Sequence, residues 1–145
     1  MRRLLSIFRV NWAGVAAGTT AAYLAGLAWY GLLFHYGWRV WSEGSSPVSA
    51  ATAALGIVVV SVLGLDWVIR RTGSLGWISG ARVGLATAFF FGLTTTLKDL
   101  LCGFKPLEII LIDAGFILVW FGLAGCMVGG LQRRSRPDPI ASPAV

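Results

Sequence analysis

Four long apolar runs dominate this chain and restrict what it can fold into. They cover residues 13–33, 49–69, 81–97 and 107–131, and short connections with charges, glycines and prolines separate them. A helix rising 1.5 Å per residue needs roughly 20 apolar residues to cross about 30 Å of hydrocarbon. Within hydrocarbon, a helix satisfies every backbone polar group inside its own segment. The sequence therefore predicts an all-α membrane protein: a four-transmembrane-helix bundle over 1–131, followed by a flexible tail over 132–145.

Composition and charge agree with a chain whose main partner is the lipid bilayer. Of the 145 residues, 57% are hydrophobic and 12% are charged, whereas soluble domains carry about 25% charged residues. The formal net charge of +6 does not indicate nucleic acid as a partner, because the basic residues cluster at the ends of the apolar runs.

The basic residues also predict an orientation. Nine lie in the N-terminal segment, the second connection and the tail: Arg2, Arg3, Arg9, Arg70, Arg71, Arg82, Arg133, Arg134 and Arg136. Three lie in the first and third connections: Arg39, Lys98 and Lys105. The positive-inside rule therefore places both termini in the cytoplasm. The alternative for the first run is a cleaved signal peptide, but the run is longer than a typical signal-peptide core.

Small residues four apart predict where helices pack closely. Two stripes and one further pair have this spacing: Gly14, Gly18, Ala22 and Gly26; Gly80, Gly84, Ala88 and Gly92; and Gly125 with Gly129. They serve packing within one chain, or one stripe faces another protomer or a partner. A shift of 66 residues superposes six glycine pairs between 14–65 and 80–131, which favours two tandem two-helix repeats with a pseudo-twofold along the membrane normal.

Two aspartates inside the runs are candidate functional residues, because each costs about 2.5–3.5 kcal/mol near the bilayer centre. Asp66 lies four residues before Arg70, with Asn11 and Arg82 at the same interface, and an ion pair with Arg70 is expected. Asp113 has no basic residue three or four positions away. At its depth come aromatic and hydroxyl residues: Trp29, Tyr30, Thr94, Thr95 and Thr96.

Two interpretations of Asp113 are open. In the first, these hydroxyls, or Lys98 reaching down, hold the carboxylate in a polar clasp between helices. In the second, the residues line an outward-facing pocket for a small ligand, a proton or a lipid headgroup.

Enzyme chemistry has little support in this sequence. The two cysteines, Cys102 and Cys126, are expected at opposite ends of the bundle without a disulfide. His35 is the only histidine and no Cys/His spacing predicts a metal site. Motifs of hydrolases, phosphate loops and zinc proteases are absent from the sequence. No cofactor is required, although His35 is either an interfacial anchor or a pigment ligand.

Three short motifs carry a family resemblance: Asn11-Trp12, Trp29-Tyr30 after Gly26, and Ile112-Asp113-Ala114-Gly115-Phe116. The chain resembles a bacterial family of small membrane proteins, domain of unknown function 1761, in which a tyrosine is usual where this chain has Phe116. The resemblance implies a four-helix protein of the bacterial cytoplasmic (inner) membrane and supplies no reaction. It also implies that Asn11, Trp29, Tyr30 and Asp113 matter beyond packing.

Three functions are consistent with these patterns. The leading hypothesis is a structural or accessory subunit that forms a homo-oligomer or joins a larger membrane complex. The alternative is a small dimeric transporter or channel with a polar site at Asp113 in its outer half. The third is a pigment- or lipid-binding subunit that uses the outer aromatic residues.

Overall fold

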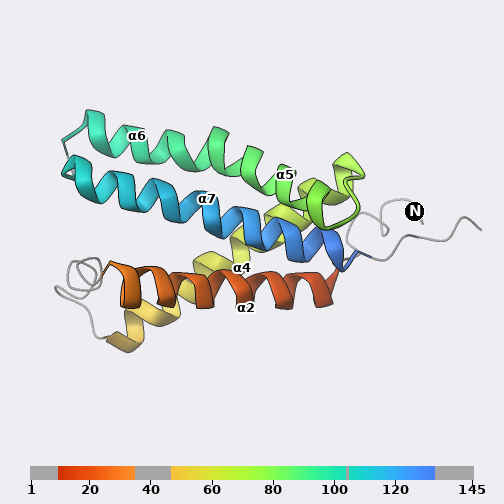
Figure 1. The fold of residues 1–145 in the computed structure, drawn as a ribbon. Helices are drawn as coiled ribbons and strands as arrows, with labels where there is room; N and C mark the ends of the chain where they lie inside the picture. The colour runs from red at the N-terminus through yellow and green to blue at the C-terminus, as the bar shows by residue number, and fades with distance from the viewer. Residues whose placement is uncertain (1–9, 35–46, 104, 133–145) are drawn as a thin grey trace, which may run out of the picture.

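All the secondary structure in the described part of the chain is helical. The computed structural model describes residues 10–34, 47–103 and 105–132. Its elements are α2 (Trp12–Ala28), the π-helix η2 (Trp29–Leu33), α4 (Pro47–Thr72), α5 (Trp77–Thr87), the π-helix η3 (Ala88–Gly92), α6 (Leu93–Leu101) and α7 (Leu107–Gly130). Because η2 continues α2 and η3 joins α5 to α6, these elements form four helical rods (Figure 1). Each rod corresponds to one predicted apolar run, so the all-α prediction is confirmed.

Two of the rods are long and apolar enough to cross a membrane. They are Ala51–Thr72 within α4 and Leu107–Gly130, which is the whole of α7. The other two rods, 12–33 and 77–101, each contain a five-residue π-helical segment, which ends the first rod and divides the second into α5 and α6.

The rods run side by side, so the molecule has two ends. The start of α2, the α4–α5 turn and the end of α7 lie together at one end, which we call the inner end (Figure 1). The opposite end, with η2 and the α6–α7 connection, is called the outer end.

Local signals set the helix boundaries. Asn11 caps α2 by accepting a hydrogen bond from the Gly14 N–H at 3.2 Å. Gly73 ends α4 with a left-handed φ of 65°, and the N–H of Ser74 donates to the Ile69 carbonyl at 3.2 Å. Glu108 lies in the first turn of α7, where its negative charge complements the helix dipole.

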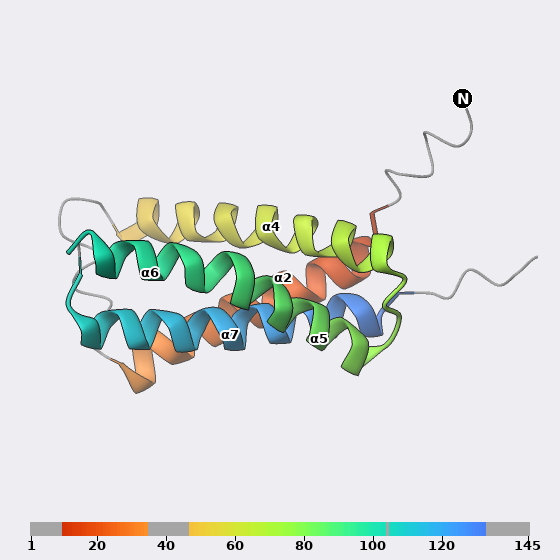
Figure 2. The same cartoon turned by 90° about the horizontal axis from the view of Figure 1, so that it is seen from above.

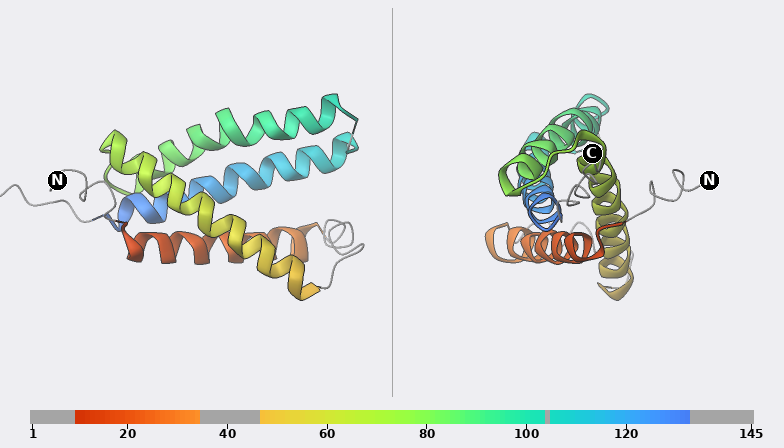
Figure 3. Two further views of the ribbon diagram at one scale, coloured as in Figure 1. Left: turned by 180° about the vertical axis from the view of Figure 1, so that it is seen from behind. Right: turned by 90° about the vertical axis from the view of Figure 1, so that its right-hand side faces the viewer.

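Helix α7 is the centre of the bundle. It contacts α2, α4, α5 and α6, and it runs alongside the α5–α6 rod (Figures 1 and 2). The core consists of small and medium apolar side chains from α2, α4 and α7: Val15, Ala22, Val58, Val62, Leu65, Ile69, Ala124 and Val128. Helix α4 crosses α2 and α7 obliquely (Figure 3), and none of its described residues before Val58 is buried. The outer part of α4 therefore projects from the bundle.

The predicted glycine stripes are packing surfaces. A β-carbon at Gly80 or Gly84 would overlap the backbone carbonyl of α7 that lies against it, and one at Gly129 would lie 2.7 Å from the Gly80 Cα. The first stripe also packs inward, because a β-carbon at Gly18 would lie 3.2 Å from side-chain carbons of both Val62 and Val128. Both stripes therefore pack against α7.

The tandem-repeat prediction is not reflected in these contacts. A β-carbon added at Gly56 or Gly64 of α4 would have no atom within 4 Å, whereas the glycines aligned with them, Gly122 and Gly130, lie against Leu85 and Trp77. The two halves therefore use aligned glycines differently.

Large apolar side chains cover the outside of the bundle. Leu32, Val48, Phe91 and Leu101, which come from the three rods around α7, are 73% to 78% exposed. The buried core, by contrast, is built mainly of valine and alanine. Apolar surface on this scale marks contact with lipid or with other proteins.

Candidate functional site

A π-helical turn places the first two site residues. The N–H of Phe34 donates to the carbonyl of Trp29 at 2.9 Å, five residues back. Segments of this kind are rare and often occur at functional sites. Here η2 contains both Trp29 and Tyr30, and it presents them to α7 at the outer end.

Asp113 of α7 is bound on both of its carboxylate oxygens. The Tyr30 hydroxyl donates to Oδ1 at 2.8 Å, and Lys105 Nζ donates to Oδ2 at 2.8 Å. The Asp113 side chain is 20% exposed and that of Lys105 is 38% exposed. The carboxylate therefore lies just below the surface and joins η2, the α6–α7 connection and α7.

The network continues to α6. Lys105 Nζ lies 3.9 Å from Asp99 Oδ2, and Lys98 Nζ lies 3.3 Å from Asp99 Oδ1. Two lysines and two aspartates thus alternate at the outer end, and their formal charges cancel.

Three predicted site residues do not join this network. The hydroxyl of Thr94 donates to the Phe90 carbonyl, and those of Thr95 and Thr96 donate to the Gly92 carbonyl. A threonine in a helix always has such a carbonyl within reach, so its hydroxyl needs no tertiary partner. Lys98 also pairs with Asp99 and not with Asp113. The predicted partners of Asp113 were therefore wrong except for Tyr30.

Sequence reasoning missed Lys105 as the cation that binds Asp113. The spacing rule for ion pairs covers positions three and four residues away on a helix, whereas Lys105 precedes Asp113 by eight residues and lies before the helix begins. The short α6–α7 connection was the available signal, because it holds Lys105 close to the first turns of α7.

Aromatic rings pack around the network. Trp29 lies 5.3 Å from Phe34 and 6.2 Å from Phe116 between ring centroids, and the Tyr30 ring packs edge-on against Phe116 at 5.0 Å. Phe116 stacks in turn on Trp120 at 5.9 Å. The Trp29 indole nitrogen is buried and has no acceptor among the residues that the structure describes. Trp29, predicted at the depth of Asp113, is half-buried and packs against α7 through Phe116.

The two specific motifs of the outer end pack against each other. A β-carbon at Gly115 would lie 3.1 Å from Cζ2 of Trp29, so the glycine makes room for the indole. Tyr30 binds Asp113 and packs on Phe116. Trp29-Tyr30 and Asp113 to Phe116 therefore form one structural unit. Since Phe116 has no hydroxyl, it contributes only its ring.

A second polar cluster lies at the inner end. Asp66 is fully buried, and its Oδ2 lies 2.6 Å from Nη2 of Arg70 in the expected i,i+4 ion pair. The backbone N–H of Asn11 lies close to this carboxylate. The Asn11 side chain also donates to the Val128 carbonyl at 3.5 Å. Asn11 thus joins α2, α4 and α7, whereas Arg82 is exposed and has no ion-pair partner among the described residues.

Neither cluster has the composition of a metal centre. No group of three or more His, Cys, Asp or Glu side chains that could hold a metal ion occurs within 10–34, 47–103 and 105–132. His35, interpreted above as an anchor or pigment ligand, lies outside the described residues. The outer arrangement can hold a carboxylate with one hydroxyl and one ammonium group, which is the chemistry of a polar clasp.

Comparison with known proteins identifies a family and no solved relative. No curated protein and no solved structure matches the chain. One family model matches residues 13–129, which include both motifs of the outer end. Because this match covers most of the chain, the protein belongs to the family described as "Protein of unknown function (DUF1761)".

Proposed function

We propose that this protein is a multi-pass protein of the bacterial cytoplasmic membrane, with four spans and both termini in the cytoplasm. In this role it acts as a structural or accessory subunit, assembled with further copies of itself or with other membrane proteins. The exposed apolar side chains and the two membrane-length helices support the placement. The excess of arginines in the segments at the inner end supports the orientation.

The hydrogen bonds of the Asp113 carboxylate are the main support for a structural role. A transport site needs a group that exchanges its partners for a substrate, but both oxygens of Asp113 are held by groups of the same chain. Such an arrangement fixes η2 and the α6–α7 connection to α7. We therefore interpret the outer cluster as a clasp between helices.

The outward face of α4 supports assembly. Gly56 and Gly64 lie eight residues apart with open space around them. Small residues at helix surfaces allow close approach of another helix in a membrane. These two positions are not used for packing within the described residues, so they are available to a second protein.

Transport is the second candidate, and one observation favours it. The Lys105–Asp113 pair is partly exposed, at 38% and 20% of its side chains, so water at the outer end reaches it. Replacement of Asp113 by asparagine in a flux assay separates the two candidates. The structural role predicts no flux in either protein, whereas the transport role predicts flux that the variant loses.

The orientation is testable with a cysteine that the chain already has. Cys102 is exposed at the end of α6, whereas Cys126 lies partly buried within α7. A membrane-impermeant maleimide should label Cys102 in intact spheroplasts, with Cys102→Ser as the control. Labelling only after permeabilisation would contradict the proposed orientation.

Assembly is tested by purification of the full chain from native membranes into nanodiscs, followed by mass spectrometry of everything that co-migrates. A defined homo-oligomer or a partner at fixed stoichiometry is the expected result. A monomer without any partner would contradict the subunit role.

A further inference from the structure

We propose that the inner end binds the phosphate-bearing headgroups of anionic phospholipids, through Arg71, which lies over the ring of the exposed Trp67, and through Arg82. This inference rests on the proposed membrane placement and orientation. It adds a ligand class, negatively charged phosphodiester lipids of the cytoplasmic leaflet.

Two adjacent arginines at the end of α4 have different surroundings. Arg70 is directed to the buried Asp66 and only 24% of its side chain is exposed. Arg71 lies on the outside, with its guanidinium 5.7 Å from the centre of the Trp67 ring. No carboxylate among the described residues pairs with Arg71. A guanidinium held against an indole with its N–H groups free is arranged to bind the oxygens of a phosphate.

Arg82 adds a second free cation near the same turn. It lies in the second turn of α5, on the other side of the connection over 73–76 from Arg71. It is exposed and also has no ion-pair partner within the described ranges. The carboxylate that the structure describes at this end, Asp66, is already bound to Arg70. The positive charge of the two arginines is therefore available to an external anion.

Over the whole sequence, the excess of basic residues also lies on the inner side. The segments assigned to the inner side carry nine basic residues and two acidic ones, Asp66 and Asp138. Those assigned to the outer side carry three basic residues and four acidic ones, Glu43, Asp99, Glu108 and Asp113. The outer side is thus close to neutral (3 − 4 = −1), whereas the inner side carries 9 − 2 = +7 and requires counter-charges from its surroundings.

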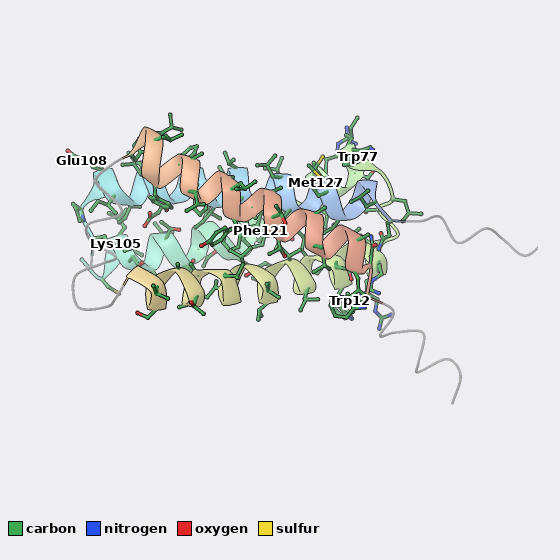
Figure 4. The ribbon with its side chains drawn as sticks, turned by 90° about the horizontal axis from the view of Figure 1, so that it is seen from below. Trp12, Trp77, Lys105, Glu108, Phe121 and Met127 are labelled. Carbon is green, nitrogen blue, oxygen red and sulfur yellow. The ribbon has the colours of Figure 1, made fainter. Side chains whose placement is uncertain are left out.

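Exposed tryptophans favour lipid as the source of that counter-charge. Trp12, Trp67 and Trp77 are 70%, 49% and 48% exposed, and Figure 4 shows Trp12 and Trp77 on opposite sides of the inner end. Indole rings in membrane proteins lie at the level of the headgroups. Arg71, which lies over the Trp67 ring, is then at the level of the phosphates, where each basic residue strengthens attraction to an anionic leaflet.

The test measures lipid preference on the full-length protein in nanodiscs. Brominated phosphatidylglycerol and brominated phosphatidylcholine quench tryptophan fluorescence on contact, and Trp67 lies beside Arg71. The wild-type protein should prefer phosphatidylglycerol. R71Q/R82Q should lower this preference by about fivefold for each arginine removed, and the effect should shrink at high ionic strength. Two controls match it: R71K/R82K keeps the charges and most of the preference, and K98Q at the outer end leaves it unchanged.

Each other outcome has a defined meaning. A wild-type preference in R71Q/R82Q would overturn the inference while leaving the membrane placement intact. Loss of the preference in inorganic phosphate, but not in sodium chloride of equal ionic strength, would make free phosphate the ligand and overturn the lipid proposal. A wild-type protein that does not enter nanodiscs would refute the placement itself. The single variants R71Q and R82Q replace the double variant if its helical circular dichroism is lost.

Discussion

Asp66 near the inner end and Asp113 near the outer end are both carboxylates in membrane-length helices, but they are stabilised in different ways. Asp66 is fully buried and its cation, Arg70, comes from the next turn of the same helix. Asp113 is 20% exposed, and its two partners come from other parts of the chain. The more deeply buried charge thus has the local partner. The shallower one ties three elements together and does more to define the tertiary fold.

The largest expected effect is the loss of the cation at the inner end. Arg70→Leu leaves Asp66 buried without its partner, and breaking a buried pair in this way costs about 3–5 kcal/mol. We expect the free energy of unfolding in mixed detergent micelles to fall by this amount. The matched variant Asp66→Leu/Arg70→Leu removes both charges and should recover most of the loss. If the double variant is as unstable as Arg70→Leu, the loss of stability does not come from an unpaired charge on Asp66, and the explanation is wrong.

The next largest effect is expected when a glycine at the inner end, Gly129, is replaced by alanine, and Gly115 at the outer end provides the comparison. A β-carbon at Gly129 would lie 2.7 Å from the Gly80 Cα and 2.8 Å from the Gly76 carbonyl oxygen. The backbones of α5 and α7 must then separate, so Gly129→Ala should cost about 1–3 kcal/mol in thermal unfolding.

Gly115→Ala at the outer end should have a smaller effect. Its β-carbon would lie 3.1 Å from a ring carbon of Trp29, and a side chain can shift where a backbone cannot. The better helix propensity of alanine, about 1 kcal/mol, offsets part of the cost. Gly31→Ala in η2, which meets open space and lies outside the proposed assembly face of α4, is the control. Equal losses at Gly129 and Gly115 would contradict the distinction between backbone and side-chain contacts.

Interactions within one helix, and those between residues at the same depth in the membrane, could be predicted from the sequence. The Asp66–Arg70 pair follows from the i,i+4 spacing, and the Tyr30–Asp113 contact is consistent with their similar depth from the outer ends of their runs. The glycine stripes also marked the helix contacts correctly, because the small-residue requirement is local to each helix surface.

The remaining features depend on how whole helices cross or how connections fold back. Asp66 is completely buried in a helix that crosses α2 and α7 obliquely (Figure 3), and no periodicity in the sequence encodes that crossing angle. Lys105 reaches Asp113 because the α6–α7 connection is short. The π-helical segment Trp29–Leu33, which contains Trp29 and Tyr30, is a local departure from α-helical geometry that the apolar pattern of the first run did not predict.

Removal of the outer cation should have a moderate effect. Lys105→Gln leaves Asp113 with Tyr30 as its partner and with access to water, since the carboxylate is not fully buried. For a partly exposed pair we expect a loss of about 1 kcal/mol or less in the free energy of unfolding. A loss as large as that of Arg70→Leu would mean that the two ends do not differ in the way that their exposure indicates.

A smaller effect is expected for the Tyr30 hydroxyl. A double-mutant cycle with Tyr30→Phe and Asp113→Asn isolates its coupling to the carboxylate, since phenylalanine keeps the ring packed on Phe116. Hydrogen bonds between membrane helices average about 0.6 kcal/mol in such cycles. A coupling of zero would indicate that the hydroxyl does not hold η2 to α7.

The smallest expected effect is a difference in how salt changes the destabilisation caused by Lys105→Gln and by Arg70→Leu. Because the Lys105–Asp113 pair is partly exposed, we expect dissolved ions to screen it. The destabilisation caused by Lys105→Gln should then shrink by roughly a few tenths of a kcal/mol between about 0.05 M and 1 M sodium chloride. Asp66 is fully buried, so the destabilisation caused by Arg70→Leu should stay constant over the same range. Measuring each variant against wild type at the same salt concentration cancels the effect of salt on the detergent. If both differences shrink equally, ions reach Asp66 as well, and the contrast between a buried local pair and an exposed tertiary clasp is lost.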